Sequence, residues 1–465
     1  MTSRWVAWLA MALALGGCHR YARPEPSLPL ASTEARSDAF ASNGSSGPAT
    51  EPATSPSSAG ARRATATERA AIEELVRAAE SIRQLRLRHP VKIEIEDDDA
   101  IVRSLRSQID EAEIERARLI YGALGLLDAD EDLRSMFAGV LGEQVIGYYD
   151  PSTGRLVIRE DVMAGLAGAF GPEQAQEARL VLVHEIVHAL QDQRLGLGKA
   201  YEKERTADAD NAFHALVEGD ATLAMLAQAL RQQGIPLSSA TAGIQQMGDY
   251  VDLNALVRGE KLDDAPAILR VTLVAPYLRG LQFVAAVQGR GGWPAVNNAH
   301  RRPPTTSEQI LHPEKFFARE PGEEIEIPEN KQVLAAGFKR IEEDTLGELE
   351  LSVYLGQAGP SDTDDEAAAG WGGDRLAVYA RGRRTAVIWW TTWDTDTDAK
   401  QAFRAARSVS HKGSRTRVER RGRSVLIVKG LPAKLQRAVW NDFIAFAGHV
   451  EGAPAPPDVR SDLRY

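Results

Sequence analysis

Two histidines and a glutamate stand together in the segment His184-Glu185-Ile186-Val187-His188. The apolar spacing around them predicts a helix over residues 173–194, in which residues four positions apart share one face. Both imidazoles can then reach one zinc ion, and Glu185 lies beside it, where a carboxylate can take a proton from metal-bound water. The segment therefore predicts a metal centre with Glu185 as general base. The alternative is a pair of core histidines satisfied by hydrogen bonds, which the apolar flanks of the helix disfavour because unpaired polar groups are costly to bury.

A zinc site needs a third protein ligand, and Glu218 is the best candidate. It lies 30 residues after His188 in a second predicted helix, 203–233, which can return alongside the first. The small residues Gly219 and Ala221 would let the two helices approach closely. The alternatives are a surface role for Glu218, or His214 as the third ligand or as a neighbour of the cluster. Asp220 and Asp192 are candidates for carboxylates that orient a ligating histidine.

Several further elements must position this cluster. Residues 143–149 and 155–158 predict two strands joined by the turn Asp150-Pro151-Ser152-Thr153-Gly154. A third apolar helix is expected over 267–288, ending at Gly289, with an ordered loop over 301–313. Upstream, we expect a helix over 68–88 stopped by Pro90, a strand over 91–95, a long helix from a cap at Asp99 to residue 127, and a short helix over 133–141.

The pattern changes after about residue 331, from long helices to short strands and helices. Helices are expected over 344–355, 399–407 and 431–447, and strands over 376–380, 385–391 and 424–428. This segment contains no cluster of potential metal ligands. It predicts a separate small α+β domain over 331–452, followed by a disordered tail over 453–465, whereas the metal site belongs to a domain over 68–330.

The N-terminus predicts export and anchoring. Residues 1–17 combine a short basic start with an apolar run too short to span a bilayer. Leu15-Gly16-Gly17 precedes Cys18, which resembles a bacterial lipobox, so Cys18 would carry a lipid that anchors the chain. The alternative is an ordinary signal peptide with an incidental cysteine. Residues 18–67 are rich in Pro, Ser and Ala and predict a flexible tether.

Composition excludes other classes. The chain has 465 residues, which favours two structured domains, and a net charge of -10, which argues against nucleic-acid binding. The local cluster Arg415–Arg423 is expected to be a solvated strand edge and turn. Because Cys18 is the single cysteine, an intramolecular disulfide, a cysteine-rich zinc site and a cysteine-protease mechanism are all excluded.

A His-Glu-x-x-His helix followed by a helix with a ligating Glu resembles the gluzincin group of zinc metallopeptidases. The phrases that carry a closer resemblance, to a poorly characterised group of zincin-like surface lipoproteins, span roughly residues 140–315: Tyr148-Tyr149-Asp150-Pro151, His188-Ala189-Leu190-Gln191-Asp192-Gln193, Glu218-Gly219-Asp220-Ala221 and Arg302-Pro303-Pro304-Thr305-Thr306-Ser307-Glu308-Gln309. The resemblance implies an α+β fold: a mainly helical zincin-like domain with a short hairpin or edge sheet, then a small α+β domain. It implies one zinc ion and an edge strand that pairs with substrate.

Gluzincins also use a Tyr or His to stabilise the transition state, and no motif here matches it. Tyr277 on the third helix and His312 in the following loop are the candidates, and the alternative, which is favoured for each, is a structural role. We therefore expect a lipid-anchored zinc metallopeptidase that acts on protein or peptide substrates in the bacterial cell envelope. Two alternatives remain open at this point: a zincin fold kept as a binding or chaperone-like module, against which the intact Glu185 argues, and a zinc hydrolase that does not cleave peptides.

Overall fold

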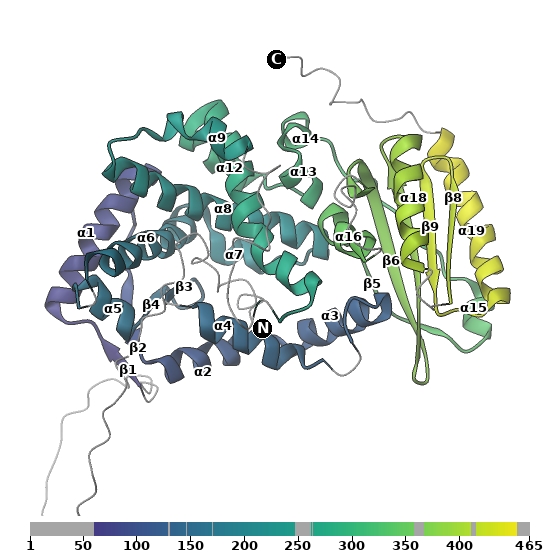
Figure 1. The fold of residues 1–465 in the computed structure, drawn as a ribbon, viewed down its shortest axis with the longest axis horizontal. Helices are drawn as coiled ribbons and strands as arrows, with labels where there is room; N and C mark the ends of the chain where they lie inside the picture. The colour runs from purple at the N-terminus through teal and green to yellow at the C-terminus, as the bar shows by residue number, and fades with distance from the viewer. Residues whose placement is uncertain are drawn as a thin grey trace, which may run out of the picture.

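The fold combines helices with two separate β-sheets (Figure 1). The computed structural model describes residues 60–452, apart from 129–130, 146, 170, 247–261, 263, 358–366 and 411–414. The predicted signal peptide, Cys18 and the tail over 453–465 lie outside the described residues. The mixture of helix and sheet agrees with the α+β class.

The first sheet has the strand order β1-β2-β4-β3, with β3 at its edge. It is formed by β1 (Ala61–Arg63), β2 (Lys92–Glu96), β3 (Gly147–Asp150) and β4 (Arg155–Arg159). The expected strand-turn-strand is present as the antiparallel pair β3–β4, with Tyr148 opposite Val157. β2 runs parallel to β4, and β1 pairs with β2. The predicted tether was therefore wrong at its end: residues 61–63 form β1, whose mostly exposed side chains gave no apolar signal.

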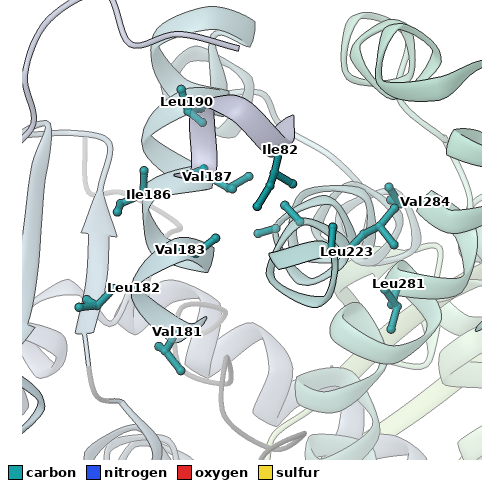
Figure 2. Close-up of a cluster of buried hydrophobic side chains, with 14 of the residues drawn as sticks. Ile82, Val181, Leu182, Val183, Ile186, Val187, Leu190, Leu223, Leu281 and Val284 are labelled. Carbon is teal, nitrogen blue, oxygen red and sulfur yellow. The ribbon is translucent and has the colours of Figure 1, made fainter. Parts of the chain in front are cut away.

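Three long helices surround the predicted metal ligands. They are α6 (Pro172–Leu195), α8 (Ala207–Gln232) and α12 (Ala267–Arg301). Pro172 occupies the first turn of α6, and Gly196 ends that helix with a left-handed φ of 76°. Their apolar faces share one core with α1, shown in Figure 2. α12 continues past its predicted end at Gly289, because Gly291 and Gly292 produce a kink instead of a stop.

By length and composition alone, α12 is long and apolar enough to cross a membrane. Its most apolar stretch of 18 residues is 72% buried inside the molecule, as in the core helix of a globular protein. Shorter elements precede, join or follow the long helices. They are α5 (Glu160–Leu166), α7 (Leu197–Tyr201), η1 (Leu237–Ser239), α9 (Thr241–Gln246), α13 (Ser307–Leu311) and α14 (Pro313–Ala318).

The N-terminal helices differ from expectation at their ends. α1 (Ala66–Arg83) begins with a capping box between Thr65 and Glu68 and ends at Gln84 in a left-handed conformation, well before Pro90. The single long helix expected from Asp99 is two helices, α2 (Asp98–Gln108) and α3 (Glu111–Leu124). Asp97 and Asp110 cap them, because each side chain accepts a hydrogen bond from a backbone N–H of the following turn. α4 (Leu133–Gln144) follows.

The second sheet has five antiparallel strands in the order β5-β6-β7-β9-β8. They are β5 (Lys339–Asp344), β6 (Trp371–Arg381), β7 (Arg384–Trp393), β8 (Thr416–Arg421) and β9 (Ser424–Lys429), accompanied by α15 (Lys331–Ala335), α16 (Gly347–Gly356), α18 (Asp396–Ser410) and α19 (Ala433–Gly452). β5 was not predicted, because its residues are mostly charged and lie on a sheet edge. The expected helix 344–355 begins only at Gly347.

The two sheets do not belong to isolated bodies. Ile120 and Leu124 of α3 pack into the same apolar cluster as Trp371 and Leu376 of the second sheet. Lys429 of β9 donates a hydrogen bond to the backbone oxygen of Leu124, at 2.7 Å. The separate folding of residues 331–452 therefore stays a prediction, and the structure shows a shared apolar core at its boundary.

Candidate metal centre

Three side chains from two helices converge inside the protein. Nε2 of His184 lies 3.1 Å from Nε2 of His188, and Oε2 of Glu218 lies 3.1 Å from the first and 3.4 Å from the second nitrogen. α6 supplies both histidines and α8 supplies the glutamate. All three side chains are buried. The residues singled out as ligands from the sequence therefore lie together in space.

The spacing of these atoms fits a zinc ion. Ligands at about 2.0–2.2 Å from zinc, placed at tetrahedral angles, are about 3.3–3.6 Å from one another. The three observed separations lie at or just below that range. Two imidazole nitrogens that face each other beside a carboxylate are also the donor set that zinc prefers. His184, His188 and Glu218 would hold the ion.

The tautomer of His188 can be read from its neighbour Gln191. The Gln191 amide nitrogen donates to the backbone oxygen of Val217 and to Oδ2 of Asp220, both at 3.0 Å. Both partners only accept, so the amide oxygen must face Nδ1 of His188, at 2.9 Å. His188 therefore carries a proton on Nδ1, so that Nε2 is the nitrogen directed at the cluster and the one that would bind a metal ion.

Asp220 supports Gln191 and does not touch a histidine of the cluster. Its carboxylate accepts hydrogen bonds from Arg83 at 2.6 and 3.0 Å and from Nε2 of His300 at 2.8 Å, as well as from Gln191. Burial alone would raise the pKa of Asp220, but the positive charges of Arg83 and His300 hold it well below its usual range. The expectation that Asp220 orients a ligand directly is replaced by an indirect contact.

Glu185 is buried beside the cluster and is held by the edge strand of the first sheet. Its Oε2 accepts a hydrogen bond from the backbone N–H of Tyr149, at 3.0 Å. Burial raises the pKa of Glu185 to about 8 in the absence of a metal. A nearby dication would favour the ionised form, which is the form a base requires.

Asp192 fixes this arrangement from the other end of Tyr149. The Tyr149 hydroxyl donates to Oδ2 of Asp192 at 2.9 Å, and the Gly198 backbone N–H donates to Oδ1, also at 2.9 Å. Asp192 therefore holds the strand that contacts Glu185. The expectation that it orients His188 was wrong, because its carboxylate lies toward β3 and the start of α7.

The metal-free cluster behaves as an ion pair. The two partners are His188 and Glu218, and burial opposes the ionisation of each. The Glu218 carboxylate nevertheless raises the pKa of His188 to about 9, and His188 lowers the pKa of Glu218 to about 2. Burial lowers the pKa of His184. A proton on His188 thus supplies the positive charge that a metal ion would bring to the same position.

The remaining candidates from the sequence lie apart from the three ligands or beside them. The His214 ring packs against Tyr201, with centroids 5.3 Å apart, and is not part of the cluster. His312 is paired with Glu348 at 2.9 Å and is not one of the residues that converge at the three ligands. Tyr277 is the candidate that is near, because its ring stacks on His184 at 6.0 Å.

A second cluster of acidic side chains is held together by a lysine. Oxygens of Glu308, Glu320 and Asp394 come together as closely as metal ligands would. The Lys315 ammonium fills the space between them, at 2.5, 2.8 and 2.6 Å respectively. This group is a buried ion-pair network that joins α13 and α14 to the end of β7, and no metal is needed to explain it.

Sequence reasoning missed four residues that build the site: Arg83, Tyr149, Gln191 and His300. Tyr149 and Gln191 occur in the phrases that carried the resemblance, but the contacts they make depend on how separate elements pack.

Residues 332–440 match a family model described as a domain of unknown function, DUF8575. No curated protein and no solved structure matches the chain. The matched segment contains none of the three cluster residues.

Proposed function

We propose that this protein is a zinc-dependent metallopeptidase, in which His184, His188 and Glu218 bind one zinc ion. The observation that carries the proposal is the convergence of three buried ligand atoms within 3.4 Å of one another, with the Glu185 carboxylate beside them. A metal with three protein ligands keeps an open position for water or substrate, as catalytic zinc sites do.

The bound zinc would polarise the scissile carbonyl and lower the pKa of a water molecule. Glu185 is the group placed to take the proton from that water and to return it to the leaving nitrogen. The Tyr149 N–H keeps the Glu185 carboxylate in position. β3 is the edge strand of the first sheet, and its four residues are buried, so the proposal requires that a substrate peptide expose this edge in order to add to the sheet alongside Glu185.

The proposal includes a location. A lipid on Cys18 would hold the protein on a membrane of the bacterial cell envelope, with residues up to about 59 as a tether. The substrates would then be proteins or peptides outside the cytoplasm. These parts rest on the sequence of residues 1–59, which lie outside the described structure.

The test is Glu185→Gln, which keeps the size of the side chain and removes the base. We expect hydrolysis of casein or of a peptide library to fall by about 10²–10⁴-fold, with the zinc content unchanged. Glu173→Gln is the matched control, because Glu173 is exposed in the first turn of the same helix. Equal cleavage by the Glu185 variant and the wild type would refute Glu185 as the base. If the zinc-loaded wild type cleaves nothing, the metal centre serves another purpose, such as binding.

A further inference from the structure

A cavity of about 140 Å³ lies between α3, α8, α12 and α16, away from the metal cluster. Asn211 lines it from α8, seven residues before Glu218, which corresponds to about 10 Å along the helix. The opposite wall comes from α16, inside the segment that matches the domain of unknown function. The cavity is therefore built where that segment closes against the helix that carries Glu218.

The walls of this cavity are mainly apolar. Ile120 of α3, Phe137 of α4 and Leu269 and Leu273 of α12 are among its apolar residues, and acidic side chains such as Glu113 also line it. Its volume is close to that of an engineered apolar cavity, about 150 Å³, that admits benzene. The space therefore suits a molecule of about six to eight heavy atoms.

One carboxyl group reaches the cavity without a charged partner. Glu350 of α16 is 2% exposed, and its Oε1 accepts a hydrogen bond from the Asn211 amide at 2.9 Å. The Tyr121 hydroxyl, which also lines the cavity, interacts with this carboxyl group, and Oε2 is buried with no other hydrogen-bond partner among the described residues. Such a group in an apolar cavity is costly unless something pairs with it.

The cations around the cavity are already engaged with other acids. Arg116 pairs with Asp344 at 3.0 Å, and Arg205 pairs with Asp210 at 3.5 Å. Burial raises the pKa of Glu350 to about 8, and the negative charges of Asp344 and Asp208 act in the same direction. The Glu350 carboxyl group is therefore held protonated near neutral pH unless a positive charge joins it in the cavity.

We infer that this cavity binds a small organic ammonium ion, an alkylamine or arylalkylamine, whose nitrogen pairs with Oε2 of Glu350 and whose apolar body packs against Leu269 and Leu273. Among the described residues, Glu350 belongs to no group of side chains close enough together to hold a metal ion. A neutral molecule of the same shape would leave Glu350 protonated and would form no ion pair with it. The inference stands independently of the proposed peptidase activity.

The test is calorimetric titration of the full-length protein with benzylamine, and with benzyl alcohol as a neutral molecule of the same shape. We expect benzylamine to bind and the alcohol to bind at least 10-fold more weakly. Glu350→Gln should weaken benzylamine binding about 10- to 100-fold, the value of one charge-assisted hydrogen bond, and should remove the preference over the alcohol. Glu329→Gln, at an exposed position, is the control and should change nothing.

A second variant tests the cavity without changing its charge. Ala117→Phe, on the α3 wall, should fill the space and abolish benzylamine binding while Glu350 is intact. Butylamine and Nα-acetyl-lysine amide distinguish the source of the ligand: binding of butylamine alone supports a free amine, and binding of both supports a lysine side chain. The inference is overturned if the wild type does not bind benzylamine, if the alcohol binds equally well, or if either variant folds and still binds as the wild type does.

Discussion

At the scale of single residues, the chemistry of the site depends on pairs that the sequence places far apart. His188 is oriented by Gln191, which is fixed in turn by Asp220, and Asp220 is neutralised by Arg83 and His300. This chain of hydrogen bonds keeps Nε2 of His188 directed at the cluster before any metal binds. The arrangement gives Gln191 a specific role, that of a positioning residue.

Replacing Gln191 should therefore weaken metal binding. Gln191→Ala removes the acceptor for Nδ1 of His188, so the ring can rotate or change tautomer, and we expect zinc affinity to fall about 10- to 100-fold. Competition with a chromophoric chelator measures it. Gln193→Ala is the matched control, since Gln193 is also buried on α6 but binds the backbone of Arg88 and His89. If both variants bind zinc equally, the role assigned to Gln191 is wrong.

The three ligand candidates and Glu185 could be predicted from the sequence because their spacing on two helices requires only helical periodicity. The partners of those residues could not. Tyr149 contacts Glu185 through its backbone and Asp192 through its hydroxyl, and neither contact leaves a periodic signal. The same limit explains the wrong role predicted for Asp192, because its carboxylate points to β3 and not to His188.

At the scale of elements, the position of Glu218 depends on two glycines that allow α8 and α12 to touch. A Cβ atom on Gly219 would lie 2.1 Å from the backbone of Gly280, and one on Gly280 would lie 2.1 Å from the backbone oxygen of Ala215. Gly219 directly follows Glu218, and Gly280 lies three residues after Tyr277. This contact therefore sets the distance between Glu218, a proposed metal ligand, and the tyrosine that stacks on His184.

A methyl group at this contact should separate the helices. We expect Gly280→Ala to lower the free energy of unfolding by about 1–3 kcal/mol through overpacking, and to weaken zinc binding because Glu218 shifts. Denaturant unfolding and zinc competition measure the two effects. Gly243→Ala in α9 is the control, since a Cβ there meets nothing within 4 Å. Unchanged zinc affinity in the Gly280 variant would show that the helix contact does not position Glu218.

Element boundaries were the least predictable part of the fold. The break between α2 and α3 follows from two aspartates that each cap a new helix, whereas the apolar pattern alone continues through both. The central strands β6 and β7 were expected from their β-branched and aromatic residues. The edge strand β5 was missed because its residues, Lys339–Asp344, are mostly charged, and a charged edge is how proteins keep such strands from pairing with other chains.

At the scale of the whole molecule, Lys315 joins the two regions of the chain. Its ammonium is buried among Glu308 and Glu320, from the same region, and Asp394, from the end of β7. Carboxylates from two regions share one cation, and α3 contributes to the core of the second sheet. We therefore expect the two regions to unfold together.

Removing this cation should destabilise the whole protein. Lys315→Met leaves three carboxyl groups facing one another without a positive charge, so we expect a loss of about 3–5 kcal/mol and a lower melting temperature. Scanning calorimetry should show one transition for the wild type and a weakened or divided transition for the variant. Lys331→Met, at an exposed position, should behave as the wild type. Two independent transitions in the wild type would show that the regions are not coupled.

The most direct test of the metal centre is the zinc content of the full-length protein by elemental mass spectrometry after dialysis against a weak chelator. We predict one zinc per chain in the wild type, little zinc in Glu218→Gln, and one zinc in Glu320→Gln, which alters the other group of acids. A wild type that retains no zinc, or a Glu218 variant that retains it while the Glu320 variant loses it, would contradict the assignment of His184, His188 and Glu218 as the ligands.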